Sequence, residues 1–166
     1  MPAATDPRSE LVAWDQGRQG LVIRGTSVPL SALWQSLRDG LTFKEFLRQH
    51  PSAPVRPVLR ILKEAGRRLS DWPWDYEEEQ QVAYARALAD NDRRFASGLV
   101  RFLPGVRGGK LLSHPSLHRV DILWGYLTHG FGLTEIQAAY PDVGRDEFRQ
   151  MVEVAGQLFE EGLVPH

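Results

Sequence analysis

Apolar side chains between residues 29 and 69 recur at the three- and four-residue spacing of helices. The first predicted helix opens at Pro29 and ends at Gly40. Its apolar stripe consists of Leu30, Leu33, Trp34 and Leu37. Thr42 and Glu45 form the pattern of a capping box, which predicts a second, short helix that stops before Pro51.

A third helix and a short strand complete this segment. Pro54 and Pro57 fit only the first turn of a helix, so the third helix should begin near Val55 and run to about Leu69. Upstream, the β-branched residues within 21–28 are interrupted by glycine and predict a strand and a turn. Three helices with a tight connection between the second and third describe a helix-turn-helix module.

The same pattern is written again 90 residues later, without a gap. The identical pairs are Leu33/Leu123, Trp34/Trp124, Leu37/Leu127, Gly40/Gly130, Glu45/Glu135, Pro51/Pro141, Ala65/Ala155 and Gly66/Gly156. In the second copy Gly130 should close the first helix, Tyr140 and Pro141 should end the second, and Gly144 should lie where the third begins. A duplication of this size indicates two copies of one supersecondary module.

The segment between the copies is predicted to hold a helix and small β elements. The helix covers about 75–96, with Glu77, Glu78 and Glu79 in its first turn and Arg93 and Arg94 in its last, the order that the helix dipole favours. Residues 99–112 are typical of two short strands around a Gly-rich turn. The expected fold is mainly α, with tandem three-helix modules at 20–69 and 113–160 and a linker at 70–112.

Two tryptophans stand beside a proline in this linker, as Trp72-Pro73-Trp74. Their large apolar area favours packing in the core or between the copies. The alternative is that Trp72 and Trp74 are exposed anchors for a protein partner.

The charge of the chain is divided unequally between the copies. Residues 20–69 carry nine basic and three acidic side chains, and residues 113–166 carry three basic and eight acidic ones, although the net charge of the chain is −1. Such asymmetry points to a binding partner. The alternative is that the charge of these solvated surfaces has drifted without any consequence for function.

Composition narrows the class of protein. The 166 residues are 42% hydrophobic and 25% charged, which is typical of one or two small globular domains. Disulfides and thiolate metal sites are excluded because the chain has no cysteine. No secretory signal and no apolar run of membrane-spanning length is visible, so we expect a soluble cytoplasmic protein.

The candidate binding site is a basic stripe on the predicted third helix. It consists of Arg56, Arg60, Lys63 and Arg67, which lie on one face opposite the apolar residues. In a helix-turn-helix this helix enters the major groove, where the planar fork of arginine can bind guanine or phosphate. Lys44 and Arg48 on the second helix should lie near flanking phosphates, and Arg24 and Arg68 are candidates to extend the patch. The alternative is an ordinary solvated basic face.

The matching positions of the second copy are Asp146, Gln150, Glu153 and Gln157. Phosphate repulsion therefore argues against a symmetric DNA clamp. Three arrangements of the second copy remain open. It can pair with the first copy as an internal pseudo-dimer, offer Asp146 and Glu153 to a protein partner, or cover the basic stripe.

Several of these features together resemble a known bacterial family. They are the run Ile23-Arg24-Gly25-Thr26-Ser27-Val28-Pro29, the helix ending in Gly40, the short helix ending in His50-Pro51 and the third helix. The chain is similar in these to the family called domain of unknown function 433, which includes VapB-type antitoxins and whose fold is homeodomain-like helix-turn-helix. The resemblance covers residues 20–69 well and 113–160 more weakly, and it implies DNA and a toxin as partners.

Catalytic chemistry has little support in the sequence. His114, His118 and Asp121 stand at helical spacing, but Pro115 interrupts them and no fourth metal ligand is evident. Glu45 and Glu135 are better explained as helix caps than as an acid–base pair. We therefore expect no enzyme, no cofactor and no metal.

The predicted function is a duplex-DNA-binding regulator, antitoxin-like in the context of that family. The first copy would contact DNA, sequence-specifically or generally, and the second would serve in pairing or partner binding. The alternative is a protein–protein interaction module, or an antitoxin without DNA binding. The chain would act as a monomeric pseudo-dimer or as a homodimer.

Overall fold

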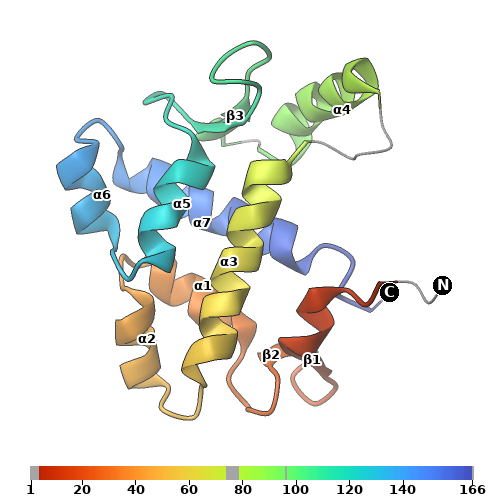
Figure 1. Ribbon diagram of the computed structural model, residues 1–166, viewed down its shortest axis with the longest axis vertical. Coiled ribbons are helices and arrows are strands. Elements are labelled where there is room, and N and C mark those ends of the chain that lie inside the picture. Colours follow the sequence, from red (N-terminus) through yellow and green to blue (C-terminus); the bar gives the residue numbers. More distant parts are fainter. Residues whose placement is uncertain (1–3, 74–78, 96, 166) are drawn as a thin grey trace.

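The computed structural model describes residues 4–73, 79–95 and 97–165 (Figure 1). The first copy holds α1 (Leu30–Arg38), α2 (Phe43–Gln49) and α3 (Val55–Asp71), and the second holds α5 (Val120–Thr128), α6 (Leu133–Ala139) and α7 (Arg145–Glu160). The remaining elements are the 3-10 helix η1 (Pro7–Glu10), α4 (Gln80–Arg93) and the strands β1 (Val12–Asp15), β2 (Gly20–Ile23), β3 (Val100–Phe102) and β4 (Leu111–Ser113). The fold is mainly α, as predicted.

The helix boundaries follow from glycine and glutamate residues at the ends of the predicted helices. Gly40 and Gly130 have φ values of +88° and +86°, which end α1 and α5 in the backbone region that glycine adopts without strain. The carboxylate of Glu45 accepts a 2.7 Å hydrogen bond from the backbone N–H of Thr42, and Glu135 accepts one of 2.8 Å from Gly132. Both glutamates are helix caps, which confirms that prediction.

Each copy also begins with a β-hairpin. β1 pairs with β2 so that Val12 lies opposite Ile23, and β3 pairs with β4 so that Val100 lies opposite Ser113. Ile23 and Ser113 are 90 residues apart, the spacing of the helical repeat. The hairpin predicted within the linker is therefore the structural start of the second copy. β1, by contrast, was not predicted, because a strand of four residues is too short to show a clear alternation of apolar and polar side chains.

The linker helix is shorter than predicted within the described residues. Glu79 is the residue that precedes the first turn of α4 and does not lie in that turn, whereas Glu77 and Glu78 lie outside the described residues. Arg93 ends the helix as expected. Trp72 is half-buried, with its ring centroid 5.4 Å from that of Phe95, and Trp74 lies outside the described residues.

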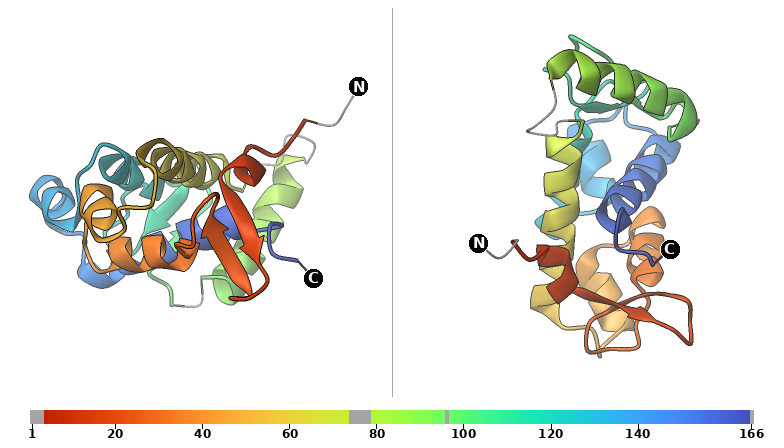
Figure 2. Two further views of the ribbon diagram at one scale, coloured as in Figure 1. Left: turned by 90° about the horizontal axis from the view of Figure 1, so that it is seen from below. Right: turned by 90° about the vertical axis from the view of Figure 1, so that its right-hand side faces the viewer.

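The two copies interlock in two layers (Figure 2). α3 and α5 lie side by side in one layer, and α1 and α7 lie in the other, with α3 also packed against α7. The first helix of each copy thus packs on the third helix of the other copy. The second copy pairs with the first as an internal pseudo-dimer.

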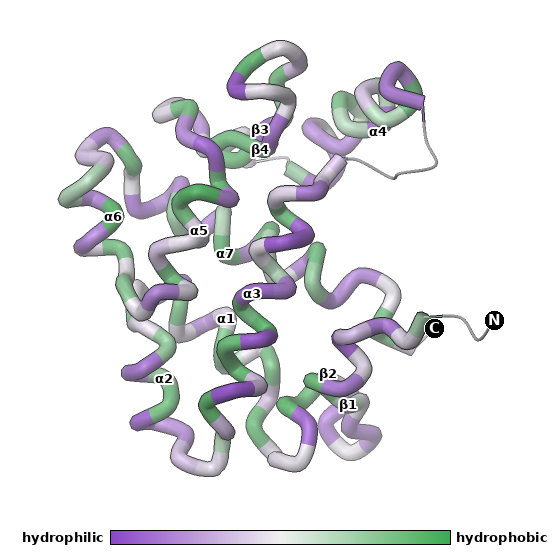
Figure 3. The backbone as a smooth tube through the Cα atoms, viewed as in Figure 1, coloured by the Kyte–Doolittle hydropathy of each residue, from purple (hydrophilic) through white to green (hydrophobic). Residues whose placement is uncertain are grey.

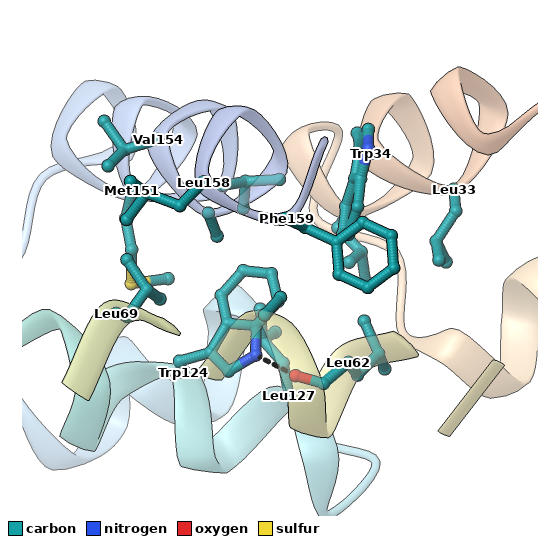
Figure 4. Packing of buried hydrophobic residues seen from close by; sticks show 14 of the residues in the cluster. Leu33, Trp34, Leu62, Leu69, Trp124, Leu127, Met151, Val154, Leu158 and Phe159 are labelled. Carbon is teal, nitrogen blue, oxygen red and sulfur yellow. Dashed lines mark hydrogen bonds between the residues drawn. The ribbon is translucent and has the colours of Figure 1, made fainter. Parts of the chain in front are cut away.

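The indoles of Trp34 and Trp124 lie in the core between the two copies (Figure 4), and each contacts a glycine of the other copy. The indole of Trp124 covers Gly66, and the indole of Trp34 covers Gly156. The two indole centroids are 6.4 Å apart. Both the tryptophan and the glycine recur in the sequence because each ring needs a side-chain-free position on the helix of the other copy.

The apolar core continues from these rings through both layers. Figure 4 shows Leu33, Leu62, Leu69, Leu127, Met151, Val154, Leu158 and Phe159 around the two indoles. No described helix is both long enough and apolar enough to cross a bilayer.

Candidate nucleic-acid interface

The predicted basic stripe occupies the outward face of α3. Arg56, Arg60, Lys63 and Arg67 are all exposed. The opposite face of the helix is buried and consists of Val58, Ile61, Leu62, Ala65 and Leu69. Hydrophilic and hydrophobic turns alternate along α3 in Figure 3, as expected when one face meets water and the other meets the core.

Two of the four stripe residues are held by carboxylates. Arg60 Nη2 lies 3.4 Å from a carboxylate oxygen of Glu10 in η1. Arg67 pairs with Glu64 at 2.5 Å and with Asp71 at 2.9 Å. The hydrogen bonds that Arg67 donates to the Glu64 carboxylate raise the pKa of Arg67 above its usual range, so this guanidinium stays charged. Exposed pairs of this kind are weak, on the order of 0–1 kcal/mol, and a competing phosphate can displace them.

The other two stripe residues are available. Arg56 and Lys63 make no ion pair with any residue in the described parts of the chain. Arg56 lies in the first turn of α3, directly after the connection from α2. The free positive charge therefore extends to the N-terminal end of α3, which is the end that contacts base edges in helix-turn-helix proteins.

The two basic residues of α2 differ in their surroundings. Both Lys44 and Arg48 are exposed. Lys44 lies beside Gly130, where an added Cβ would stand 3.1 Å from Lys44 Cε. Lys44 is thus directed toward the connection between α5 and α6, whereas Arg48 is exposed one turn further along α2, closer to the start of α3 in the chain.

Arg24 and Arg68 do not extend the patch, contrary to expectation. The guanidinium of Arg24 donates hydrogen bonds to the backbone carbonyls of Ser9, at 2.8 Å, and Val12, at 3.2 Å. Arg68 is half-buried, and burial together with the nearby charge of Arg8 lowers its pKa. Arg24 thus holds the N-terminal segment in place, a role that requires the tertiary structure to be recognised, whereas Arg68 pairs with Glu64 of its own helix at 3.6 Å.

The acidic copy does not cover the stripe. Asp146 and Glu153 are exposed on α7, and within the described residues neither pairs with a basic side chain of α3. α3 and α7 belong to opposite layers, so their outward faces point to opposite sides of the molecule (Figures 1 and 2). Geometry as well as charge therefore excludes a symmetric clamp made by a single chain.

The N-terminal segment that flanks α3 was not predicted from the sequence. Arg8 is buried, and its Nη1 donates hydrogen bonds of 2.6 Å to the backbone carbonyls of Phe159 and Glu161 at the end of α7. The Asp6 carboxylate pairs with the same guanidinium at 2.6 Å. η1 therefore lies beside α3 while it is tied to α7. The signal in the sequence was Asp6-Pro7, a helix-capping residue followed by a proline.

The remaining candidate metal ligands make ion pairs or hydrogen bonds with neighbouring side chains. His118 Nε2 lies 2.8 Å from Asp142 Oδ1, and Asp121 pairs with Arg119 at 2.6 Å. Among the described residues, no three histidine, aspartate or glutamate side chains are grouped so that they could hold a metal ion.

The candidate interface thus consists of the outward face of α3 with the exposed end of α2, next to an N-terminal segment that supplies one carboxylate. No protein-family model, curated protein or solved structure matches the chain.

Proposed function

We propose that this protein is a regulator that binds duplex DNA through α3 and α2. The observation that carries the proposal is the exposed row of four basic side chains on α3, the longer helix of a pair joined by residues 50–54. A short helix, a tight connection and a longer helix with a polar outward face are the order of a helix-turn-helix.

Electrostatics supports DNA as the ligand. Each lysine or arginine that meets a phosphate releases condensed counterions, and this release supplies most of the non-specific affinity for DNA. Arg56, Lys63 and Arg48 make no ion pair with described residues, so they can meet phosphates without first losing a partner. Arg60 must exchange Glu10 for phosphate, which lowers its contribution.

The contact is expected at the N-terminal half of α3. η1 lies beside the middle of α3, where Pro7 and Leu11 line a shallow hollow together with Arg60, Lys63 and Arg67. The first turn of α3 and the end of α2 lie away from this segment (Figure 1). When the N-terminal end of α3 enters the major groove, Arg56 faces the base edges and Arg48 of α2 faces the phosphate backbone.

The test is fluorescence anisotropy of the protein with random-sequence duplex DNA at several salt concentrations. The double variant Arg56→Glu, Lys63→Glu should lower affinity at low salt by about ten-fold or more and reduce the slope of log affinity against log salt by about two. The matched control is Arg145→Glu, Arg149→Glu, which changes the net charge equally on exposed positions of α7. The control should bind within about three-fold of the unchanged protein, because long-range charge effects are screened over roughly 10 Å.

Two results would overturn the proposal. One is a folded protein that does not bind DNA at low salt. The other is an equal loss of affinity in the two double variants, which would mean that only net charge matters and that α3 does not face the DNA.

A further inference from the structure

A polar hollow lies between the β1–β2 hairpin of the first copy and the C-terminal end of α7 in the second, which are neighbours in Figures 1 and 2. Its volume of about 540 Å³ falls in the range of small-molecule sites, roughly 300–1,000 Å³. The lining includes Arg18, Gln19, Leu21, Pro29, Ser31 and Glu160. No residue of α2 or α3 lines it, so the hollow is separate from the candidate nucleic-acid interface.

The polar side chains around this hollow have hydrogen-bonding capacity that the fold does not use. Within the described parts of the chain, the side chains of Gln19, Ser31 and Glu160 make no hydrogen bond and no ion pair. The guanidinium of Arg18 approaches one carboxylate oxygen of Asp15 only loosely, at 3.8 Å. Polar groups that converge on a hollow while they lack close partners are typical of ligand sites.

Glu160 lies where a carboxylate is unfavourable. It is half-buried, and burial raises its pKa because no cation or hydrogen-bond donor offsets the lost hydration. Two other carboxylates with little exposure do have such partners, since Glu147 accepts a hydrogen bond from the Ser116 hydroxyl and Glu64 pairs with Arg67. A perturbed group of this kind in a hollow is a feature of functional sites, where stability is sacrificed for binding.

Gln19 is a second residue at which local stability is sacrificed. Its φ is +50°, in the left-handed region that is costly for any residue with a Cβ atom. The position 90 residues later is Gly109, whose φ of +71° lies in the same region without strain. The first copy thus keeps a strained glutamine at the hollow where the second copy has glycine. Two departures from local stability at one hollow, Gln19 and Glu160, indicate a site that serves binding.

We propose that this hollow binds a small zwitterion with one ammonium and one carboxylate group, the class to which free amino acids belong. Glu160 accepts hydrogen bonds from the ammonium, and the planar fork of Arg18 binds the carboxylate. Leu21 and Pro29 supply apolar contact for the rest of the molecule.

The opposite charges of Arg18 and Glu160 exclude simpler ligands. An inorganic anion would be repelled by Glu160, and a simple cation would be repelled by Arg18. A hard metal ion needs several oxygen ligands, whereas the lining of the hollow includes a single carboxylate. A zwitterion satisfies both charged side chains at once.

The test is isothermal titration calorimetry of the whole chain with each of the standard amino acids in turn. At least one should bind with a Kd of about 1 mM or tighter. For the tightest of them, the amine that lacks the carboxylate and the acid that lacks the ammonium should each bind about ten-fold more weakly, because each loses a charged hydrogen-bonding partner.

Two variants assign the contacts. Glu160→Gln and Arg18→Gln should each weaken binding of the amino acid by about ten-fold or more. Glu160→Gln should also leave binding of the acid analogue little changed, which a merely structural effect would not do. The matched controls are Glu153→Gln and Arg149→Gln, which remove the same charges at exposed positions of α7 and should leave the affinity within about two-fold. Circular dichroism melting verifies that every variant is folded.

The inference is overturned if no standard amino acid binds, or if the amine or acid analogue binds as tightly as the amino acid. Equal losses in the hollow variants and the controls also reject it. Because the hollow shares no residue with α2 or α3, none of these outcomes bears on DNA binding, which the Arg56→Glu, Lys63→Glu variant tests separately.

Discussion

The indole of Trp124 lies so close to Gly66 that an added Cβ would stand 2.7 Å from its Cδ1 atom. These residues come from different copies of the repeat, and the reciprocal contact of Trp34 with Gly156 is looser, at 3.2 Å. The pseudo-dimer interface is therefore similar but not identical on its two sides.

Gly66→Ala should destabilise the protein although alanine favours helices. The methyl group would displace the Trp124 ring, and overpacking of this kind costs about 1–3 kcal/mol, against a gain of about 1 kcal/mol in helix propensity. The control is Gly125→Ala, where no heavy atom lies within 4 Å of the added Cβ and propensity alone should stabilise by about 1 kcal/mol. Urea unfolding measures both, and stabilisation of the same size in the two variants would contradict the described packing.

The two tryptophans should respond differently to replacement by phenylalanine. Trp124 Nε1 donates a 2.7 Å hydrogen bond to the backbone carbonyl of Leu62, whereas Trp34 Nε1 is buried with no partner among the described residues. Both substitutions remove ring volume, but only Trp124→Phe loses a hydrogen bond and only Trp34→Phe removes an unsatisfied donor. Trp124→Phe should therefore lower the free energy of unfolding by about 1–2 kcal/mol more than Trp34→Phe. Equal losses in chemical denaturation would reject this asymmetry.

Arg8 should contribute more to stability than an ordinary N-terminal arginine. Arg8→Ala leaves the backbone carbonyls of Phe159 and Glu161 without this donor, and the loss of a charged hydrogen-bonding group at a buried site costs about 2–4 kcal/mol. Thermal unfolding measures the loss. Arg18→Ala in the turn between β1 and β2 is the control, because Arg18 is exposed and its substitution should cost less than about 0.5 kcal/mol.

The same contact makes stability depend on acid pH. Hydrogen bonds from Arg8 lower the pKa of Asp6 from 3.8 to about 2. Because the folded-state pKa is lower than the unfolded one, the contribution of Asp6 is fully present above the unfolded value and is lost as pH falls through about 2. Asp6→Asn should therefore destabilise the protein at pH 6, and this difference should shrink as pH falls from 3.8 and vanish below about 2, as measured by denaturant unfolding at each pH. A difference in the free energy of unfolding that stays constant with pH would contradict this prediction.

Glu160 should show the opposite dependence. Burial raises the pKa of this carboxyl above 4.5, because the charged form is poorly solvated at the end of α7. Stability is therefore lost as pH rises from the unfolded pKa through the raised folded one. Glu160→Gln should raise the free energy of unfolding at pH 7, and this gain should vanish below the unfolded pKa. Glu153→Gln on the exposed face of α7 is the control and should change stability by less than about 0.5 kcal/mol.

Glu10 should weaken DNA binding if the proposed interface is correct. Its carboxylate lies 3.4 Å from Arg60 Nη2 and must be displaced by phosphate. Glu10→Gln should therefore strengthen binding at low salt by about two- to five-fold, the range that corresponds to an exposed ion pair. Anisotropy titration measures this effect, and Glu161→Gln on the α7 side is the control for net charge. Equal strengthening by both variants would show that Glu10 does not act through Arg60.

Local sequence determined most of the secondary structure of this protein. Proline positions set where α1 and α3 begin, Gly40 and Gly130 set where α1 and α5 end, and the Thr42–Glu45 box fixed the start of α2. These signals act within one helical turn, so they can be read without knowledge of the fold. The exposure of the basic stripe was also predictable, because the spacing of apolar residues on α3 fixes the opposite face.

Only the tertiary structure decided how the two copies meet. That the first helix of each copy packs on the third helix of the other depends on ring-to-glycine contacts between residues such as Trp124 and Gly66, which are 58 positions apart in the chain. The tertiary structure also decided which arginines are structural and which are available to a ligand. Arg8 and Arg24 donate hydrogen bonds to backbone carbonyls, while Arg56 stays exposed. Arginine looks the same in the sequence in both roles, because its hydrogen-bond partners are set by long-range packing.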